Sequence, residues 1–307
     1  MPRQRFSALS LGTQIDHHDC MTRARLGLGT AQFGQEYGIS NTRGRVPLDD
    51  VKAILCRASD AGIRDLDTAA GYGEAEHVLG SLSHLTSRFR IVTKTISLRH
   101  GLDAVLRRAR RSVSKLGRTP IDLLLVHSAG DLRGNDGEGL WTGLLGLRDE
   151  GLFGNIGISA YVADDPLALA RKFRPAALQV PVSLLDQRLI RDGTLGALKN
   201  LGVEIHARSL FLQGLLFVPG DRLPAKLRSA SRHLDALHRR FHETGTTPLA
   251  AALAFALQRP EINVALVGVT SLAEFEEILR QADAPIPTLD WSACALDDPF
   301  VLTPSLW

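Results

Sequence analysis

Four residues of types that hold or move protons stand at or just after the ends of predicted strands. The segment GIRDLDTAAGYGEAE places Asp67 at the end of a short apolar strand and Tyr72 in the loop that follows. The strand RIVTK ends in Lys94, and the strand IDLLLVHS carries His127 at its end. Because the carboxyl ends of parallel strands meet on one face of a barrel, these side chains are predicted to converge there. A phenol beside an ammonium group, with a carboxylate to hold that group and an imidazole nearby, indicates a proton donor whose pKa is tuned by its neighbours.

Each residue has a plainer interpretation when it is taken alone. An aspartate at a strand end often caps the next helix, and a histidine after LLLV is often a hydrogen-bonded core residue. Two facts favour chemistry instead. Lysine is far rarer than arginine in this chain, yet Lys94 ends an apolar strand, and Tyr72 is one of only 3 tyrosines.

The elements that would position these groups alternate along the chain from Arg25 onward. Short apolar runs predict eight strands, at Arg25–Thr30, Gly62–Asp67, Phe89–Lys94, Ile121–His127, Asn155–Ser159, Ala176–Val180, Val203–Arg208 and Asn263–Gly268. Amphipathic patterns predict helices at Leu48–Ala61, Glu74–Leu82, Leu102–Leu116, Gly137–Glu150, Pro166–Phe173, Thr194–Asn200, Pro248–Gln258 and Leu272–Gln281. Each parallel strand needs a crossover long enough for a helix, so the alternation predicts an α/β fold, a (β/α)8 TIM barrel in a single domain.

Two segments depart from this alternation. The stretch from Gly214 to Gly245 is too long for a bare loop and carries a helical pattern near Ser231–Thr244, which is typical of a functional insertion. Residues 1–20 have no periodicity, and Met21 opens MTRARLGLGT like a natural start. We therefore predict a disordered extension over residues 1–20 and the barrel over residues 21–307.

The composition is that of a globular protein. Of the 307 residues, 44% are hydrophobic and 22% are charged, which excludes disordered, collagen-like and coiled-coil classes. The longest apolar run, Pro248–Leu257, is well short of the ~20 residues of a transmembrane helix, and the N-terminus lacks the apolar core of a secretory signal. Three widely spaced cysteines argue against a disulfide framework. These features together predict a cytoplasmic protein without a membrane partner.

Missing motifs exclude several kinds of site. The sequence has no GK[ST] phosphate loop, no GxGxxG turn, no HExxH zinc pattern and no GxSxG nucleophile turn, so we expect no metal and no Rossmann loop. The stretch LRRARRSVSKLG is predicted to carry four arginines on the exposed face of its helix, Arg107, Arg108, Arg110 and Arg111. No aromatic residues are interleaved with them, so no nucleic-acid partner is expected.

The segments that carry the four candidate catalytic residues resemble those of the aldo-keto reductase superfamily. Its Asp, Tyr, Lys, His tetrad matches Asp67, Tyr72, Lys94 and His127 in DLDTAAGYG, IVTK and LLLVHS, and GLGTAQFG, GISA, LQVPVSLLDQ and ARSLFLQGLL extend the resemblance from Arg25 to about Leu279. The resemblance implies a (β/α)8 barrel with NADP(H), or NAD(H), extended across its C-terminal face. It also implies hydride transfer between a carbonyl and an alcohol, with Tyr72 as the general acid and base.

The resemblance further implies which residues contact the cofactor. By position these are Gly29, Thr30, Asp67, Ser159, Gln179, Arg208, Ser209, Leu210, Gln213, Gly214, Gly268, Thr270, Ser271 and Glu277. Three positions depart from the family's habit. Ala160 replaces the asparagine that usually follows the serine, and Arg208 replaces the aromatic that stacks on the nicotinamide. Glu274 stands where an arginine often binds the 2′-phosphate, which predicts weak discrimination between NADP(H) and NAD(H).

The substrate is expected to be a small carbonyl or alcohol. We predict that Phe33, Tyr37, Trp141 and the C-terminal segment DPFVLTPSLW form the pocket wall. Two alternatives stay open at this point. One is a regulatory barrel that binds the cofactor without physiological turnover, against which the intact tetrad weighs. The other is a dehydrogenase that acts mainly in the alcohol-oxidising direction, on a sugar or a pyridoxal-like alcohol.

Overall fold

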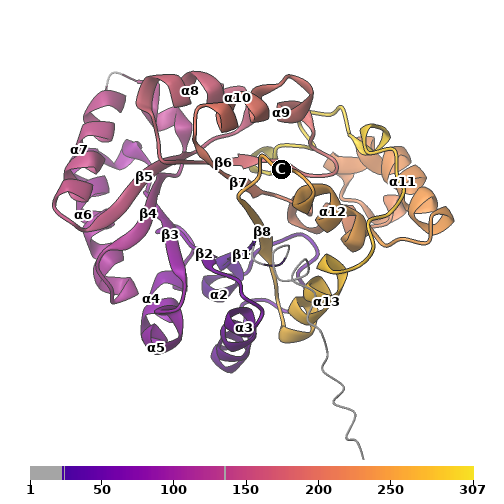
Figure 1. The fold of residues 1–307 in the computed structure, drawn as a ribbon, viewed down its shortest axis with the longest axis horizontal. Coiled ribbons are helices and arrows are strands. Elements are labelled where there is room, and N and C mark those ends of the chain that lie inside the picture. Colours follow the sequence, from indigo (N-terminus) through magenta and orange to yellow (C-terminus); the bar gives the residue numbers. More distant parts are fainter. Residues whose placement is uncertain (1–22, 24, 135) are drawn as a thin grey trace, which may run out of the picture.

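The strands form a closed barrel in a computed structural model that describes residue 23 and residues 25–134 and 136–307 (Figure 1). All neighbouring strands are parallel, and the order around the barrel is the order in the sequence. The strands are β1 (Leu26–Gly29), β2 (Asp65–Asp67), β3 (Arg90–Lys94), β4 (Ile121–Val126), β5 (Phe153–Ser159), β6 (Ala177–Pro181), β7 (Glu204–Arg208) and β8 (Val264–Gly268). The predicted (β/α)8 barrel is confirmed. The predicted extension over residues 1–20 lies outside the described residues.

Helices surround the barrel and connect its strands (Figure 1). The longer ones are α3 (Leu48–Asp60), α4 (Ala75–Ser81), α6 (Leu102–Leu116), α7 (Gly137–Asp149), α8 (Pro166–Phe173), α10 (Thr194–Asn200), α11 (Ser231–Glu243), α12 (Pro248–Leu257) and α13 (Leu272–Ala282). Single turns form α2 (Ala31–Gly34), α5 (Ser83–Thr86) and α9 (Arg188–Arg191). The 3₁₀ helices are η1 (Leu98–His100), η2 (Ala129–Leu132), η3 (Val162–Asp164), η4 (Leu212–Phe217), η5 (Gly220–Arg222), η6 (Ala225–Ala230), η7 (Ser292–Cys294) and η8 (Pro304–Leu306).

Each predicted strand and helix overlaps an observed one, with differences at the ends. Strand β2 begins at Asp65 rather than at Gly62 because Gly62 has φ 79°, a left-handed conformation that turns the chain after α3 and is unlike a strand. The helix predicted in the insertion is α11, and Leu234, Leu237 and Phe241 are its buried side chains.

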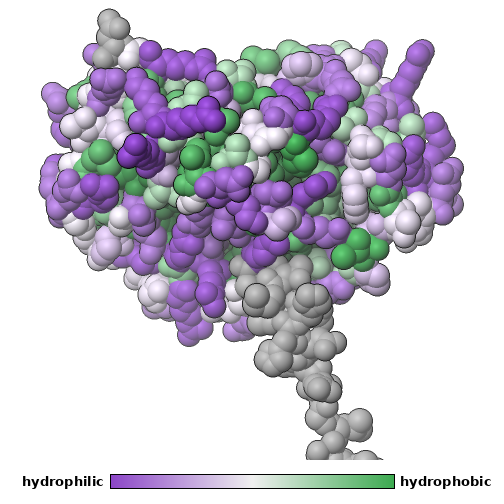
Figure 2. Space-filling view, turned by 45° about the horizontal axis from the view of Figure 1, so that its top comes forward, coloured by the Kyte–Doolittle hydropathy of each residue, from purple (hydrophilic) through white to green (hydrophobic). Residues whose placement is uncertain are grey.

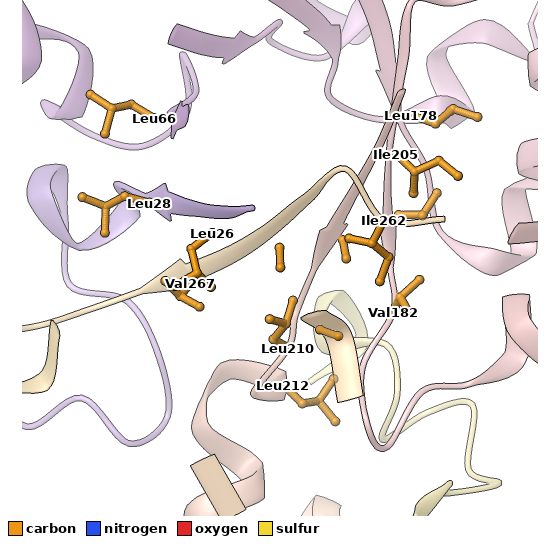
Figure 3. Close-up of a cluster of buried hydrophobic side chains, with 14 of the residues drawn as sticks. Leu26, Leu28, Leu66, Leu178, Val182, Ile205, Leu210, Leu212, Ile262 and Val267 are labelled. Atoms are coloured by element: carbon orange, nitrogen blue, oxygen red, sulfur yellow. The ribbon is translucent and has the colours of Figure 1, made fainter. Parts of the chain in front are cut away.

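Alternate residues along each strand face opposite sides of the barrel wall. One set packs outward beneath the helices, and Figure 3 shows Leu28, Leu66, Leu178, Ile205 and Val267 in this layer. The other set points inward. The inward set is polar at several positions. The Gln179 amide on β6 donates to Asp67 on β2, a strand that is not a neighbour of β6, so both of these side chains point into the barrel. The barrel wall therefore separates an outer apolar shell from an interior that is polar where the candidate site lies and that also holds a small apolar cluster of Val92, Leu123, Leu125 and Ala177.

The arginine-rich helix α6 differs from the prediction at one residue. Arg107, Arg110 and Arg111 are exposed, but Arg108 is half-buried and pairs with Glu76, which is buried. The prediction that all four arginines face solvent is therefore wrong for Arg108. Figure 2 shows hydrophilic residues over most of the face in view, with hydrophobic residues in small groups between them. In the described part of the chain, no helix is long and apolar enough to cross a bilayer.

Candidate active site

Lys94 lies at the centre of the group of four residues that the sequence singled out. Its ammonium group donates to Asp67 Oδ1 at 2.5 Å, to the carbonyl oxygen of Thr68 at 2.9 Å and to the Tyr72 hydroxyl at 3.4 Å. Lys94 is 1% exposed and Asp67 is 4% exposed. The His127 ring stands edge-on to the Tyr72 ring, with their centroids 5.9 Å apart. The structure thus brings together the four residues at the carboxyl ends of β2, β3 and β4.

Small residues let the loop that carries Tyr72 approach the barrel closely. The Ala70 amide donates to the carbonyl oxygen of Lys94 at 3.2 Å, so the loop follows the end of β3. A Cβ atom at Gly34, in α2, would lie 1.9 Å from the carbonyl oxygen of Tyr72. Gly73 has φ 54°, and a Cβ there would lie 2.4 Å from the carbonyl oxygen of Gly34. The two glycines therefore allow two backbones to pack at a distance that larger residues would prevent.

Burial and charge set opposite protonation states for Lys94 and His127. Burial by itself would lower the pKa of Lys94, but the charges of Asp67 and Tyr72 outweigh it and raise that pKa. The pKa of His127 falls to about 4, because burial and the charge of Lys94 disfavour its imidazolium form. At neutral pH the site therefore holds a cationic lysine and a neutral imidazole, which keeps one ring N–H as a hydrogen-bond donor.

A cavity of about 640 Å³ opens above these residues. Asp67, Tyr72 and His127 form one part of its wall, and Gly268 and Thr270 form another. All 3 tyrosines of the chain line it, since Tyr37 and Tyr161 are also in the wall. Aromatic side chains thus gather where the chain places its candidate proton donor.

A model of the aldo/keto reductase family matches residues 25–295. The chain belongs to the aldo/keto reductase family. It is 27% identical to pyridoxal 4-dehydrogenase of Microbacterium luteolum over 89% of this chain and 93% of that protein. It is 28% identical to L-galactose dehydrogenase of Arabidopsis thaliana over 82% of each. Matches to aldo-keto reductases of a Mycobacterium strain and of Mycolicibacterium smegmatis extend over only 63% and 56% of those proteins.

Solved structures share the fold of this aldo-keto reductase. An aldo-keto reductase from Bacillus halodurans, solved in its holo form, superposes with a TM-score of 0.70 at 19% sequence identity, covering 88% of this chain and 90% of that one. At that identity the likeness establishes the fold alone. Family membership makes the protein an oxidoreductase that interconverts carbonyls and alcohols, and members of the family use nicotinamide cofactors.

Nearly all the residues that the resemblance assigned to the cofactor line the cavity of this reductase. They are Gly29, Thr30, Asp67, Ser159, Gln179, Arg208, Ser209, Leu210, Gln213, Gly214, Gly268, Thr270 and Glu277. Ser271 is not in the wall, because its side chain caps α13 by accepting from the Glu274 amide at 3.2 Å. Gly29 and Gly268 are register partners on β1 and β8, and the Gln32 amide lies over Gly268, where a Cβ would be 2.9 Å from Gln32 Nε2.

The loop after β7 has an unusual backbone. Ser209, Leu212 and Gln213 have φ values of 62°, 48° and 54°, a region that residues other than glycine seldom adopt and that is often found at functional sites. The Ile39 amide donates to the carbonyl oxygen of Gln213 at 3.1 Å. A Cβ at Gly214 would lie 2.0 Å from Ser40 Oγ. The loop between α2 and α3 therefore packs directly against η4 at the cavity.

Arg208 is held by a residue that the sequence reasoning missed. Its guanidinium lies 4.2 Å from the centre of the Tyr161 ring and donates to the carbonyl oxygen of Ala160 at 3.3 Å. Stacking of this kind restrains an arginine that would otherwise be mobile. Tyr161 directly follows GISA and is one of 3 tyrosines, and this position beside a motif is the signal that could have drawn attention to it. Gln32, Asn41, Phe211 and Phe217 also line the cavity without having been predicted.

The predicted substrate pocket needs correction at two residues. Phe33 is fully buried on the inner side of α2, and Trp141 on α7 is buried with its ring 5.3 Å from that of Phe173. Neither residue is in the cavity wall, because α2 and α7 direct these two aromatic side chains into the core. Tyr37 does line the cavity, and burial together with the nearby phenols of Tyr72 and Tyr161 raises its pKa to about 12. It therefore stays protonated.

The C-terminal segment contributes to the wall through backbone turns rather than through its last aromatic. Pro304 and Ser305 line the cavity, whereas the Trp307 indole donates to the carbonyl oxygen of Phe300 at 3.2 Å. Among the residues that the structure describes, no group of three or more His, Cys, Asp or Glu side chains is arranged to hold a metal ion.

Carboxylates surround the start of α13. Glu274 Oε2 accepts from the Thr270 amide at 2.7 Å, while Ser271 Oγ accepts from the Glu274 amide. Glu277 accepts from Gln281 Nε2 at 2.8 Å and pairs with Arg280. At the start of α13, the Ser271 hydroxyl therefore caps the helix, and the Glu274 carboxylate holds the amide of Thr270, the residue before the cap.

Proposed function

We propose that this aldo-keto reductase transfers a proton between Tyr72 and the oxygen of a small carbonyl or alcohol, with a nicotinamide cofactor bound along the cavity. The observation that carries the proposal is the contact of Lys94, buried and paired with Asp67, with the hydroxyl of the cavity residue Tyr72. We propose that it works on small molecules in the cytoplasm, as its composition predicts.

The residues present fit a dinucleotide. Gly29 and Gly268 contribute no side chains of their own to the wall, and the Gln32 amide beside Gly268 offers a hydrogen-bonding group to a ligand there. At the opposite wall, Ser159 and Gln179 offer a hydroxyl and an amide to a carboxamide, and Ser209 begins a loop with backbone amides for a pyrophosphate. When bound, the cofactor supplies or accepts a hydride.

The chain's own residues manage the proton. A phenol is a poor acid near neutral pH unless a neighbouring positive charge stabilises its ionised form. Lys94 provides that charge to Tyr72, and Asp67 holds Lys94 in place. In reduction, Tyr72 donates its proton to the developing alkoxide oxygen. In alcohol oxidation, the ionised phenol takes the proton back.

His127 contributes orientation rather than acid–base chemistry. Its pKa of about 4 keeps the ring neutral near pH 7, so a ring N–H can donate to the substrate oxygen without giving up its proton. Its place beside Tyr72 directs both donors to the same oxygen. A substrate oxygen held by two donors is aligned for proton transfer before the reaction begins.

For the cofactor we propose binding of NADP(H) with little advantage over NAD(H). A site that selects a 2′-phosphate normally supplies a guanidinium or an ammonium group. Here Glu274 and Glu277 line the adjoining wall, and Glu274 takes the Thr270 amide that an anion would otherwise use. Arg280 is paired with Glu277, and Arg208 is stacked on Tyr161.

A second candidate is a dehydrogenase that works mainly in the alcohol-oxidising direction. Two relatives that align over most of this chain are named as dehydrogenases of pyridoxal and of L-galactose. The same residues serve both directions, so assays with alcohols and with carbonyls, each with both cofactors, decide between them.

Replacement of Tyr72 by phenylalanine tests the proposed function. Tyr72→Phe removes only the hydroxyl, so carbonyl reduction is expected to fall by roughly 10²–10⁴-fold or more. Cofactor affinity, measured by fluorescence titration, should stay near that of the wild type. Lys94→Met should be similarly damaging. Turnover of Tyr72→Phe close to the wild-type rate contradicts the assignment and favours a cofactor-binding barrel without this chemistry.

A further inference from the structure

Arg108 is the one arginine of its cluster on α6 that turns toward the barrel. It donates through Nη2 to Glu76 Oε2 at 2.6 Å and to the carbonyl oxygen of Ala70 at 3.1 Å. The Glu76 side chain is 1% exposed and the Arg108 side chain is 18% exposed. Neither residue lines the cavity, so this ion pair lies behind the proposed site rather than in it.

The contacts of this pair form a closed ring that includes the backbone of Lys94. Thr93, the residue before Lys94, donates through its hydroxyl to Glu76 Oε1 at 2.7 Å. Glu76 holds Arg108, and Arg108 holds the carbonyl oxygen of Ala70. The amide of Ala70 then donates to the carbonyl oxygen of Lys94. The ring thus ties β3, the loop after β2, α4 and α6 together.

Tyr72 lies between the two points of its own segment that this ring holds. Ala70 precedes it by two residues and Glu76 follows it by four. Its amide donates to the carbonyl oxygen of Ala69 and its own carbonyl oxygen accepts from the Ala75 amide, so the segment is a hydrogen-bonded turn. The hydroxyl contact between Tyr72 and Lys94 is 3.4 Å long, near the outer limit for a hydrogen bond. A small shift of the turn would break it.

We propose that the Arg108–Glu76 pair is a positioning device that holds the Tyr72 hydroxyl against Lys94, and this inference rests on the proposed function of Tyr72. A buried ion pair is a poor choice for stability alone, because removing two charges from water can cost as much as the pair returns. It does provide directed contacts. Arg108 reaches a carboxylate and a backbone carbonyl together, which an apolar pair of similar size could not do.

The test compares two ion pairs that start from the same helix. Arg108→Met breaks the inner pair, and Arg110→Met breaks the exposed pair of Arg110 with Glu150. Each variant is checked by circular dichroism and thermal melting. Its affinity for NADPH is then measured by fluorescence, and its single-turnover reduction of 4-nitrobenzaldehyde with NADPH is followed as a function of pH.

We expect Arg108→Met to slow single-turnover reduction by roughly tenfold or more, since a misplacement of about 1 Å can have a larger effect than that. The basic limb of its pH profile should move to higher pH, because an ionised phenol displaced from Lys94 loses a neighbouring cation. NADPH affinity should change little. Arg110→Met should match the wild type in rate and profile. Arg108→Lys, which keeps the charge and a donor, should recover part of the rate.

Three outcomes overturn the inference. One is a wild-type rate and pH profile in a folded Arg108→Met protein. Another is a slower rate with an unmoved basic limb, which indicates general damage to the fold. The third is an equal loss in Arg110→Met. Tyr72→Phe separates this inference from the proposed function. An active Tyr72→Phe protein refutes the proposed function. An inactive Tyr72→Phe protein, together with an Arg108→Met protein of normal activity, refutes only the positioning role.

Discussion

At the scale of the residue, burial decides what a charge can do in this protein. Lys94 is almost fully buried and keeps its charge because Asp67 pairs with it. Glu274 is exposed at the cavity edge, and its carboxylate accepts a hydrogen bond from the Thr270 amide. The charge of Lys94 is fixed in the protein interior, where the low dielectric constant strengthens its effect on Tyr72. The charge of Glu274 acts through water, where salt screens it.

Removal of the Glu274 charge should improve NADPH binding more than NADH binding. A like charge near the 2′-phosphate costs roughly 1 kcal/mol at an effective dielectric near the surface, which is several-fold in affinity. Glu274→Ala is therefore expected to tighten NADPH several-fold in fluorescence titration and to leave NADH nearly unchanged, with a smaller gain at higher salt.

The matched control for this experiment is Glu276→Ala. Glu276 is on the same helix, but it pairs with Arg57 and does not line the cavity. Glu276→Ala should change the affinity for neither NADPH nor NADH. If the unaltered protein binds NADPH roughly a hundredfold more tightly than NADH, a cation that we have not recognised holds the phosphate, and our interpretation of Glu274 is wrong.

At the scale of the element, β3 and β7 are joined across the end of the barrel opposite the site. Arg90 donates through Nη1 and Nη2 to the two carboxylate oxygens of Glu204 at 3.0 and 3.1 Å, and His206 Nε2 lies 3.0 Å from Glu204 Oε1. Arg90 Nε also lies 3.5 Å from Asp65, where burial raises the carboxyl pKa. Since β3 and β7 are not neighbours in the sheet, this cluster braces the barrel from inside.

Glu204 should make the stability of the barrel depend on pH in the acid range. Burial alone would raise its pKa, but hydrogen bonds from His206 and Arg90 outweigh burial and lower it from the usual 4.5 to about 2. A carboxyl group whose pKa is lower in the folded than in the unfolded protein stabilises the fold at pH values above its unfolded-state pKa. This contribution is lost as the pH falls toward the folded-state pKa. At about 1.4 kcal/mol per pKa unit, the contribution at neutral pH is up to about 3 kcal/mol.

Urea unfolding of Glu204→Gln at several pH values measures this effect. At pH 7 the variant is expected to have a lower free energy of unfolding, and its deficit should shrink as the pH falls below about 4.5, where wild-type Glu204 begins to lose its advantage. Glu150→Gln, which breaks only an exposed pair with Arg110, should have little effect. A deficit of the same size at every pH would mean that the carboxylate charge is not responsible.

At the scale of the whole molecule, the cavity is assembled from segments far apart in the sequence. Its wall takes residues from the ends of β1, β2, β5, β6, β7 and β8, from η4 and from the C-terminal segment. A ligand that contacts all of these can bind only when they are folded together. Such a ligand stabilises the native state by mass action.

Cofactor binding should therefore raise the melting temperature of the whole barrel. At a concentration of about 100 times its Kd, a ligand adds about 2.7 kcal/mol, which corresponds to a shift of several degrees in differential scanning fluorimetry. NADPH and NADH should both produce the shift, and Tyr72→Phe should keep it because the role that we propose for the hydroxyl is in the chemical step rather than in cofactor affinity. If neither cofactor shifts the melting temperature even at millimolar concentration, the cavity is not a dinucleotide site.

The sequence by itself predicted the barrel and the groups at the ends of its strands. Periodicity is a local property, so the alternation of strands and helices could be read without coordinates. The rule that parallel strands end on one face then placed Asp67, Tyr72 and Lys94 together. The motifs around them supplied the resemblance, and most residues implied for the cofactor do line the cavity.

Only the tertiary structure decided where side chains on helices and loops point. Phe33 and Trp141 belong to the core, and Arg108 leaves the exposed face of α6 for Glu76. The stacking of Arg208 on Tyr161 was equally invisible in the sequence. Side chains of a strand point strictly to alternate faces. The direction of a half-exposed side chain on a helix depends instead on which partner the neighbouring element offers. That partner is set by packing between segments distant in sequence, which no local pattern records.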